Sequence, residues 1–204
     1  MPPLLILGTR NRKKRDELAA ILRGLALTLG DLADRPDLPE LEETEPTFAG
    51  NAQLKAVGYA KLTGEWVLAD DSGLVVPALG GRPGVLSARY AGRQGDDAAN
   101  NQKLLAELAA LPDTPGRRDA YYVCVLALAN PQGEVVATVE GRCHGEIVRQ
   151  PRGSGGFGYD PLFLIREYHR TFGELGPAAK RAISHRARAL AQLRPVLVKQ
   201  FGLA

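Results

Sequence analysis

The chain begins with a short apolar run that leads directly into a polar, basic turn and then into an amphipathic segment. Residues 4–7 are continuously apolar and are followed by Gly8, a pattern typical of a buried strand. Beyond the turn, apolar residues recur at helical spacing, at Leu18, Ile21, Leu22 and Leu25. A strand, a turn and a helix in this order restrict the fold to classes that pack helices against a sheet.

The next segment predicts a helix and a strand that leads to an acidic pair. The helix is expected over residues 48–62, with Gly64 placed to end it. One edge of this helix carries polar side chains at helical spacing, Thr47, Asn51 and Lys55. The apolar residues 66–69 predict a short strand that ends at Asp70-Asp71. The acidic pair is therefore expected at a strand end.

The second half of the chain is richer in strand patterns. We expect a helix through Leu104, Leu105, Leu108 and Leu111, a hairpin of residues 121–129 and 134–140, a strand at 163–165, and a last helix that Ser184 caps and Pro195 kinks or ends. Helices near both ends and strands between them predict one α/β domain over residues 1–204 with a mixed sheet.

Composition limits the compartment and the partners. A chain of 204 residues with 45% hydrophobic residues suits one domain with a substantial core. No apolar stretch approaches the ~20 residues that a membrane helix needs, and the N-terminal apolar run precedes the basic cluster, opposite to a signal peptide. We therefore expect a cytoplasmic protein without membrane contact. Cys124 and Cys143 lack metal or redox spacing and are expected to be small buried residues.

Basic residues are unevenly distributed, although the net charge is only +3. One cluster consists of Arg10, Arg12, Lys13, Lys14 and Arg15, and the other of Lys180, Arg181, His185, Arg186 and Arg188. Either cluster could hold a polyphosphate, or each could be a solvated helix face. The first cluster lies where a strand meets a helix, which favours an anion, although Thr9 or Asn11 could also simply cap the helix. A nucleic-acid partner is not expected, because acidic pairs would then face phosphate.

Two acidic pairs, Glu42-Glu43 and Asp70-Asp71, accompany these cations. Carboxylates in small number suit Mg²⁺, which keeps several waters and bridges to substrate phosphates. A carboxylate beside such a metal can also accept a proton from an attacking water. Each pair alone could be a set of solvated loop acids, but two pairs among anion sites favour a metal triphosphate as ligand.

A glycine-rich segment at residues 153–158 matches the pattern G-x-G-x-x-G. Neither a strand before it nor a helix after it is expected, so we reject a dinucleotide-binding fingerprint. What remains is a loop whose backbone amides can approach a ligand, with Phe157 and Tyr159 as stacking surfaces and Asp160 as an acceptor.

Six blocks in order along nearly the whole chain resemble the inosine triphosphate pyrophosphatases, also called non-canonical purine NTP pyrophosphatases, XTP/dITP diphosphatases or HAM1-like proteins. The blocks are residues 9–14; 42–44 with 47–52 and 55–56; 69–74; 83–90; 155–163; and 180 with 183–186. The resemblance implies an elongated single α/β domain with a long mixed sheet, two lobes around a nucleotide cleft, and a homodimer. It also implies Mg²⁺-dependent hydrolysis of ITP, dITP and XTP to the monophosphate and pyrophosphate. A related pyrophosphatase for pyrimidine nucleotides is the alternative within the enzyme class.

The resemblance also implies roles for individual residues. Asp71 would be the general base and a metal ligand, Lys14 and Lys55 would assist catalysis, and Glu42 or Glu43 would be a second metal ligand. The substrate-binding residues would be Thr9, Arg10, Asn11, Arg12, Lys13, Lys14, Ser72, Phe157, Gly158, Tyr159, Asp160, Lys180, His185 and Arg186. The role of Asp70 stays open.

Position 10 departs from the family pattern, which usually has glycine there. If the backbone at Arg10 has positive φ, the side chain is strained by ~1 kcal/mol or more. Either the turn is ordinary in this chain, or a phosphate contact compensates for the strain.

Overall fold

The computed structural model describes residues 1–203, which form two compact units. Unit 1 comprises Met1–Asp71, Cys124–Gly141 and the chain from Arg186 onwards, and unit 2 comprises Ser72–Val123 and Arg142–His185. The prediction that residues 1–204 form one domain stays a prediction.

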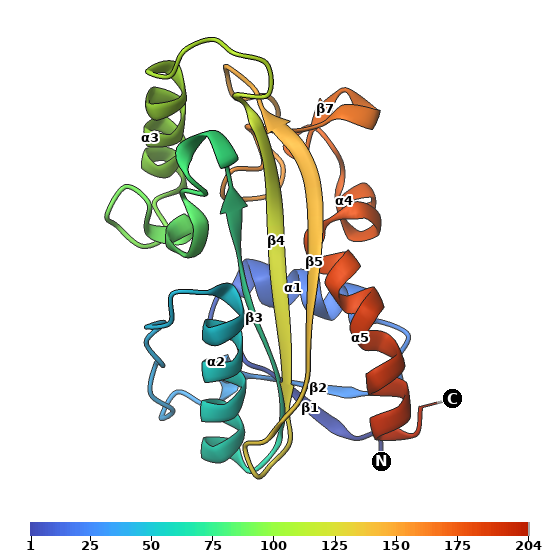
Figure 1. Ribbon diagram of the computed structural model, residues 1–204. Coiled ribbons are helices and arrows are strands. Elements are labelled where there is room, and N and C mark those ends of the chain that lie inside the picture. The colour runs from blue at the N-terminus through green and yellow to red at the C-terminus, as the bar shows by residue number, and fades with distance from the viewer. Residues whose placement is uncertain (204) are drawn as a thin grey trace. The chain divides into compact units, whose positions relative to one another are not determined.

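Helices and strands alternate irregularly along the chain (Figure 1). The strands are β1 (Leu4–Leu7), β2 (Thr28–Asp31), β3 (Trp66–Val75), β4 (Asp119–Ala129), β5 (Val135–Ile147), β6 (Phe163–Ile165) and β7 (Arg170–Thr171). The α-helices are α1 (Arg12–Leu22), α2 (Phe48–Thr63), α3 (Asp97–Ala109), α4 (Pro177–Ile183) and α5 (His185–Phe201). Short 3₁₀ segments are η1 (Leu32–Asp34), η2 (Pro77–Leu79), η3 (Gly84–Arg89) and η4 (Arg166–Tyr168).

The strands form one sheet in the order β2-β1-β3-β4-β5-β6-β7. β1 pairs in parallel with β2 and with β3, whereas β6 pairs antiparallel with β5 and with β7. The predicted α/β class and mixed sheet are therefore confirmed. Among residues 1–203, no helix combines the length and the apolar character that crossing a membrane requires.

The core of unit 1 follows from the two-residue period of its strands. Leu5 and Leu7 of β1 point to one face of the sheet, where they pack with Leu18 of α1 and Leu193 of α5. Figure 1 shows α2 on the other side of the long strands from α5. α2 has an apolar stripe that is buried and consists of Ala52, Ala56, Tyr59 and Ala60. Helices thus cover both faces of this part of the sheet.

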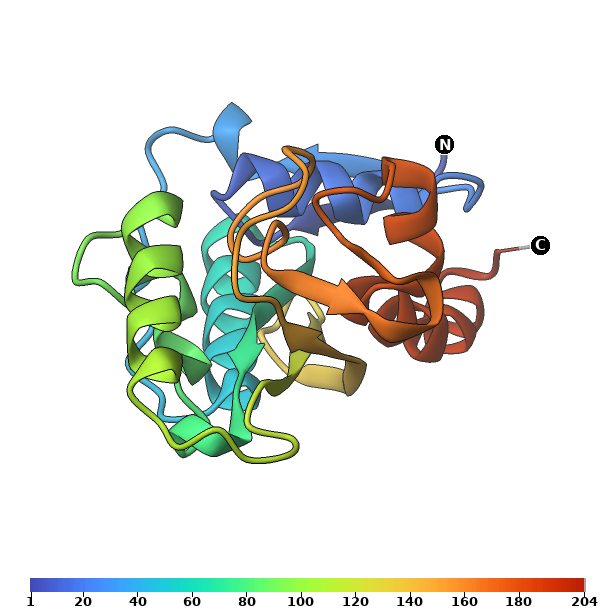
Figure 2. The same cartoon turned by 90° about the horizontal axis from the view of Figure 1, so that it is seen from above.

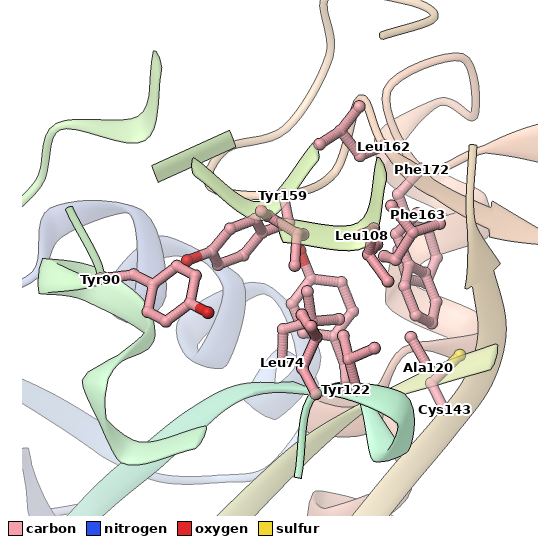
Figure 3. Close-up of a cluster of buried hydrophobic side chains, with 14 of the residues drawn as sticks. Leu74, Tyr90, Leu108, Ala120, Tyr122, Cys143, Tyr159, Leu162, Phe163 and Phe172 are labelled. Atoms are coloured by element: carbon pink, nitrogen blue, oxygen red, sulfur yellow. The ribbon is translucent and has the colours of Figure 1, made fainter. Parts of the chain in front are cut away.

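The core of unit 2 is built around aromatic rings (Figure 3). The rings of Tyr122 and Phe163 have centroids 4.7 Å apart, and Phe163 stacks on Phe172 at 5.6 Å. Leu74 of β3 and Leu108 of α3 pack into the same cluster. Both cysteines are buried, as predicted, and burial raises the pKa of the Cys124 thiol to about 12.

Most of the predicted elements are confirmed with small changes of boundary. α2 begins at Phe48, with the Thr47 hydroxyl accepting from Gly50 N–H, and ends at Gly64, whose φ is 67°. α1 ends at Leu22, so Leu25 lies beyond it. The hairpin turns at residues 130–134, and β5 continues to Ile147, past the predicted end. α3 ends at Ala109, before Leu111.

One predicted strand end is wrong, and one of the two alternatives for Pro195 is excluded. β3 does not end at Asp70-Asp71 but runs through both residues to Val75. The strand can continue because nearby cations compensate both carboxylates, as described below. α5 does not end at Pro195 but continues to Phe201, since Leu193 and Leu197 pack into the core of unit 1 on either side of the proline. Three short elements, β2, β7 and α4, were not predicted from the sequence.

Candidate active site

Asp71 lies inside β3, and two side chains of α2 hold its carboxylate. Asn51 Nδ2 donates a hydrogen bond to Asp71 Oδ2 at 3.3 Å, and Lys55 Nζ lies 3.8 Å from Asp71 Oδ1. Both side chains come from the polar edge of α2 that the helical spacing predicted, and both are buried. The pattern Asn51-x-x-x-Lys55 therefore places an amide and an ammonium on the same carboxylate.

Burial raises the pKa of Asp71, because a charged carboxylate loses hydration when it is covered. Lys55 and Lys14 lower this pKa and Glu43 and Asp70 raise it further, with a net rise above the ordinary value. A carboxylate of raised pKa is a better proton acceptor than a solvated one. Asp71 is therefore chemically suited to the role of a general base.

Lys55 connects Asp71 with the acidic loop before α2. Its ammonium donates to Glu43 Oε1, so Glu43 and Asp71 converge on one cation. Burial lowers the pKa of Lys55, but Asp71, Asp70 and Glu43 raise it more, so the lysine stays charged. Glu42, by contrast, is exposed. Of the two loop carboxylates, only Glu43 is thus joined to this group by a contact that the structure describes.

Asp70 points into a different group of charges. It is fully buried, Arg186 Nη2 donates to its Oδ2 at 3.1 Å, and Lys14 Nζ lies 3.6 Å from the same oxygen. Arg186 Nη1 also donates to Glu17. Burial alone would raise the pKa of Asp70, but the charges of Lys14, Arg186 and Lys55 outweigh it and hold the pKa well below its usual range. Asp70 is therefore an ionised partner of two cations.

Arg186 was predicted to contact substrate, and the contacts that the structure shows for it are with two acidic side chains of the protein. Its side chain is 1% exposed and is shared between Asp70 and Glu17. The two acids raise the pKa of the guanidinium despite the opposing effect of burial. The direct substrate contact stays a prediction, while the observed contacts give Arg186 a role in holding the acidic strand.

The turn that joins β1 to α1 is an ordinary capped helix start. Asn11 Oδ1 accepts the N–H groups of Lys13 and Lys14, and Thr9 Oγ1 accepts that of Asn11. Arg10 does not have positive φ, so the first of the two alternatives holds and no strain needs compensation. Its guanidinium Nη2 donates to Leu38 O at 2.5 Å.

Substituting Arg10→Gly is therefore expected to destabilise the protein slightly. Glycine would relieve no strain here and would increase the conformational freedom of the unfolded chain, which costs roughly 0.4–1 kcal/mol. Urea unfolding of both proteins would measure the difference. An increase in stability would mean that the backbone at position 10 is strained after all.

A second group of predicted residues meets around Asp160 in unit 2. Lys180 Nζ lies 2.5 Å from Asp160 Oδ2, and the N–H of Phe157 donates to the same oxygen at 2.7 Å. The Lys180 ammonium also lies 4.4 Å from the centroid of the Phe157 ring. His185 stacks on Tyr122 at 4.7 Å between centroids, and Tyr122 Oη donates to Asp160 Oδ1 at 3.3 Å. Asp160 thus organises a lysine and three aromatic rings.

The glycine-rich loop approaches Asp160 closely. Gly156 has φ 73°, and a Cβ at that position would lie 2.0 Å from Asp160 Oδ2. The Gly158 N–H donates to Asp97 Oδ2 at 2.9 Å. The loop therefore requires glycine at position 156, where any side chain would collide with Asp160.

The positions of Tyr159 and Ser72 give no direct support for the predicted contacts with substrate. The Tyr159 ring belongs to the core of unit 2, and its hydroxyl donates to Ser87 O at 2.9 Å (Figure 3). It was expected as a stacking surface, but its side chain is 3% exposed. Ser72 is half-buried on β3, next to Asp71. Their predicted substrate contacts stay predictions.

Three residues of these groups were absent from the predicted site. Asn51 was recognised as lying on the polar edge of α2 but was given no role. Glu17 lies one turn after Lys14 on α1, so helical spacing could have linked it to the basic cluster. Tyr122 occupies a strand position that reads as core, and nothing in the sequence distinguishes it from its apolar neighbours.

Acidic side chains near Lys55 are the candidate ligands for a divalent metal. Among residues 1–203, no group of three or more His, Cys, Asp or Glu side chains is arranged to hold a metal ion. Glu43 and Asp71 nevertheless converge on one positive charge, and two carboxylates are enough for Mg²⁺ when substrate phosphates and water complete its shell. Glu43 and Asp71 are therefore chemically compatible with a divalent metal.

The fold and these two groups define the class of protein. A buried carboxylate of raised pKa beside lysines, in an α/β protein, is typical of an enzyme active site. The comparison with known proteins narrows the class. A model of the Ham1 family matches residues 5–196, and the chain belongs to this family.

Relatives support the assignment along nearly the whole length. A protein of Rhodopirellula baltica named dITP/XTP pyrophosphatase is 49% identical over 195 residues, which is 96% of this chain and 93% of the relative. One of the same name from Geobacter sulfurreducens is 53% identical over 190 residues, 93% of this chain and 94% of that one. The solved structure of a HAM1 protein from Coxiella burnetii is 42% identical and superimposes with a TM-score of 0.87, covering 97% of this chain and 99% of the other. The predicted family resemblance is confirmed.

Proposed function

We propose that this enzyme hydrolyses the non-canonical purine nucleoside triphosphates ITP, dITP and XTP to the nucleoside monophosphate and pyrophosphate. Such a reaction would remove these nucleotides from the cellular pool. The observation that carries the proposal is Asp71, a buried carboxylate of raised pKa that contacts Lys55 and Asn51. The names of the relatives, dITP/XTP pyrophosphatase, support the choice of substrate.

The proposed chemistry is an attack of water on the α-phosphorus. Asp71 accepts the proton of the attacking water, a new P–O bond forms, and the bond between the α-phosphorus and the bridging oxygen breaks. The leaving group is pyrophosphate. Lys14 and Lys55 provide positive charge for the triphosphate, and Asn51 holds Asp71 in place through its 3.3 Å hydrogen bond.

A divalent cation fits this scheme. Glu43 and Asp71 would hold Mg²⁺ together with the substrate phosphates, and Glu42, which is exposed, is the less suitable ligand. When bound, the metal would neutralise charge on the phosphates and lower the pKa of a water molecule. Lys55 would remain beside both carboxylates and keep them ionised.

The residues around Asp160 are proposed to bind the nucleoside. Phe157 offers an aromatic face, and Lys180 places a hydrogen-bond donor and a positive charge beside it. Hypoxanthine and xanthine present a 6-oxo acceptor where adenine has an amino donor, so a donor-lined site disfavours ATP. His185 is proposed to contribute to this pocket from its stack on Tyr122.

We also propose that the enzyme is a homodimer in the cytoplasm and that residues 1–204 act as one domain. Support comes from the family resemblance and from relatives that match this chain over 93% or more of their own length. Light scattering coupled to gel filtration would report the mass of the particle. A monomer at enzyme concentrations used in assays would contradict the dimer.

A nucleotide panel tests the proposed function. Purified protein is incubated with Mg²⁺ and, separately, with ITP, XTP, dITP, ATP, GTP and dUTP, and the phosphorus products are identified by ³¹P NMR. The expected result is pyrophosphate release from the first three nucleotides and little turnover of ATP. Release of orthophosphate, equal turnover of ATP or preference for dUTP would contradict the proposal. Omission of Mg²⁺ is expected to abolish turnover.

A further inference from the structure

A surface pocket in unit 1 is lined by arginines that have no role in the proposed reaction. Its volume is about 260 Å³, and it is lined by Arg10, Arg12, Arg15, Asp31 and Ala33. Arg10 and Arg12 were predicted to bind the substrate triphosphate. The position, the charge and the size of this pocket are reasons to assign it a different anion.

The first reason is position relative to the sheet. β1 lies between β2 and β3, and neighbouring residues of α1 reach to opposite sides of it. Lys14 Nζ lies 3.6 Å from Asp70 of β3, whereas Arg15 donates to Asp31 at the end of β2. Figure 2 shows α1 alongside β1 and β2. The pocket therefore lies on the β2 side, and the carboxylates of the proposed active site lie on the β3 side.

The second reason is the charge of the pocket. Asp31 and Asp16 both bind Arg15, with Asp16 Oδ1 accepting from its Nε at 3.0 Å and from its Nη2 at 2.7 Å. This arginine is thus fixed in position and neutralised. Arg10 uses one hydrogen bond, to Leu38 O, and within residues 1–203 Arg12 makes no ion pair. Within residues 1–203, no carboxylate neutralises Arg10 or Arg12, so both positive charges can bind an anionic ligand.

The third reason is the chemistry and size of the site. The guanidinium group matches phosphate oxygens with parallel N–H donors, which a point charge does not. A volume of about 260 Å³ admits a small phosphate-type anion but is below the ~300 Å³ at which pockets for drug-sized molecules begin. The first-turn amides of Lys13 and Lys14 are occupied by Asn11, so the arginines and not the helix end define the site.

We propose that this pocket is a second anion site, distinct from the group around Asp71, and that it binds inorganic pyrophosphate. Arg12 and Arg10 would contact the anion, and Arg15, held by Asp31 and Asp16, would shape the wall beside them. The proposal concerns binding and does not require turnover of any nucleotide. The anion-site proposal can therefore fail while the proposed function holds, and the proposed function can fail while the anion site binds pyrophosphate.

The test is a titration of the full-length ¹⁵N-labelled protein with inorganic pyrophosphate, followed by amide NMR without metal or nucleotide. The Ala33 amide reports on the pocket, and the Asn51 amide reports on the group around Asp71. Saturable shifts are expected at Ala33. In Arg12→Gln the dissociation constant read at Ala33 is expected to rise roughly tenfold, since one charge-assisted contact is worth about that factor.

Arg23→Gln is the matched control, because Arg23 is exposed at the other end of α1 and does not line the pocket. It should leave the affinity read at Ala33 unchanged. An equal loss in both variants would reduce the effect to general surface charge and overturn the proposal. Absence of saturable shifts at Ala33, or shifts at Asn51 alone, would overturn it as well. Arg12 is exposed, so its replacement should leave the fold intact, which the remaining amides verify.

Discussion

Asp71→Asn is expected to abolish most of the hydrolysis of ITP while leaving the protein folded. Removal of a general base typically lowers kcat by roughly 10²–10⁴-fold. The fold should tolerate the change because the pKa of Asp71 is raised, which means that the native environment disfavours its charge. Lys55 keeps Glu43 as a partner, and an asparagine oxygen can still accept from Asn51.

Steady-state kinetics with ITP and urea unfolding of the same preparation would measure both effects. Asp37→Asn is the matched control, since Asp37 is an exposed aspartate on the loop before α2. The control should keep wild-type kcat. Substantial residual activity in Asp71→Asn, with the fold intact, would remove Asp71 from the role of base.

The same substitution one residue earlier is expected to act on stability. Asp70→Asn leaves the fully buried Arg186 with only part of its compensating charge, and breaking a buried ion pair in this way costs roughly 3–5 kcal/mol. The lowered pKa of Asp70 points in the same direction, because it shows that the native environment favours the charged form. Urea unfolding at neutral pH should show a large drop in the unfolding midpoint.

The contribution of Asp70 to the free energy of unfolding is expected to decrease as the pH falls. An unfolded aspartate titrates near ~3.9, and the native pKa of Asp70 lies lower, so its contribution is complete at neutral pH and is lost as the pH falls through the native pKa. The stability difference between wild type and Asp70→Asn should therefore shrink in acid. If Asp70→Asn unfolds at the wild-type midpoint at neutral pH, the ion-pair interpretation is wrong.

A double variant separates lost charge from lost packing. Asp70→Asn combined with Arg186→Met removes both members of the buried pair and leaves a side chain that fills space. Since replacing a buried ion pair by apolar groups is often neutral, the double variant should recover part of the stability lost in Asp70→Asn. A further loss would show that packing of the arginine stem matters more than its charge.

The contrast between Asp70 and Asp71 shows how far local pattern reaches. Side chains alternate along a strand, so adjacent aspartates in β3 must point to opposite faces of the sheet. The sequence pattern predicted the pair at a strand end, where side chains need not alternate, so the role of Asp70 stayed open. Because the strand runs through the pair, Asp71 contacts α2, whereas Asp70 contacts Lys14 and Arg186.

Helical spacing was the most informative local signal for the site. It placed Asn51 and Lys55 on one edge of α2, and the structure shows that both side chains contact Asp71. The cap at Asn11 was equally local, since it depends only on residues within one turn. Spacing could not show that Glu43 rather than Glu42 meets Lys55, because that depends on the path of a loop without regular structure.

The sequence by itself determined the α/β class, most helices and strands, the family, and the residue types that the chemistry needs. These follow from periodicity, capping and ordered motifs, which act over a few residues at a time. Only the tertiary structure decided which charges meet: Asp70 with Arg186, Asp71 with Lys55, and Arg15 with Asp31. Asp70 and Arg186 are 116 positions apart in the sequence, and a buried charge is stable only where the packed fold brings it an opposite one.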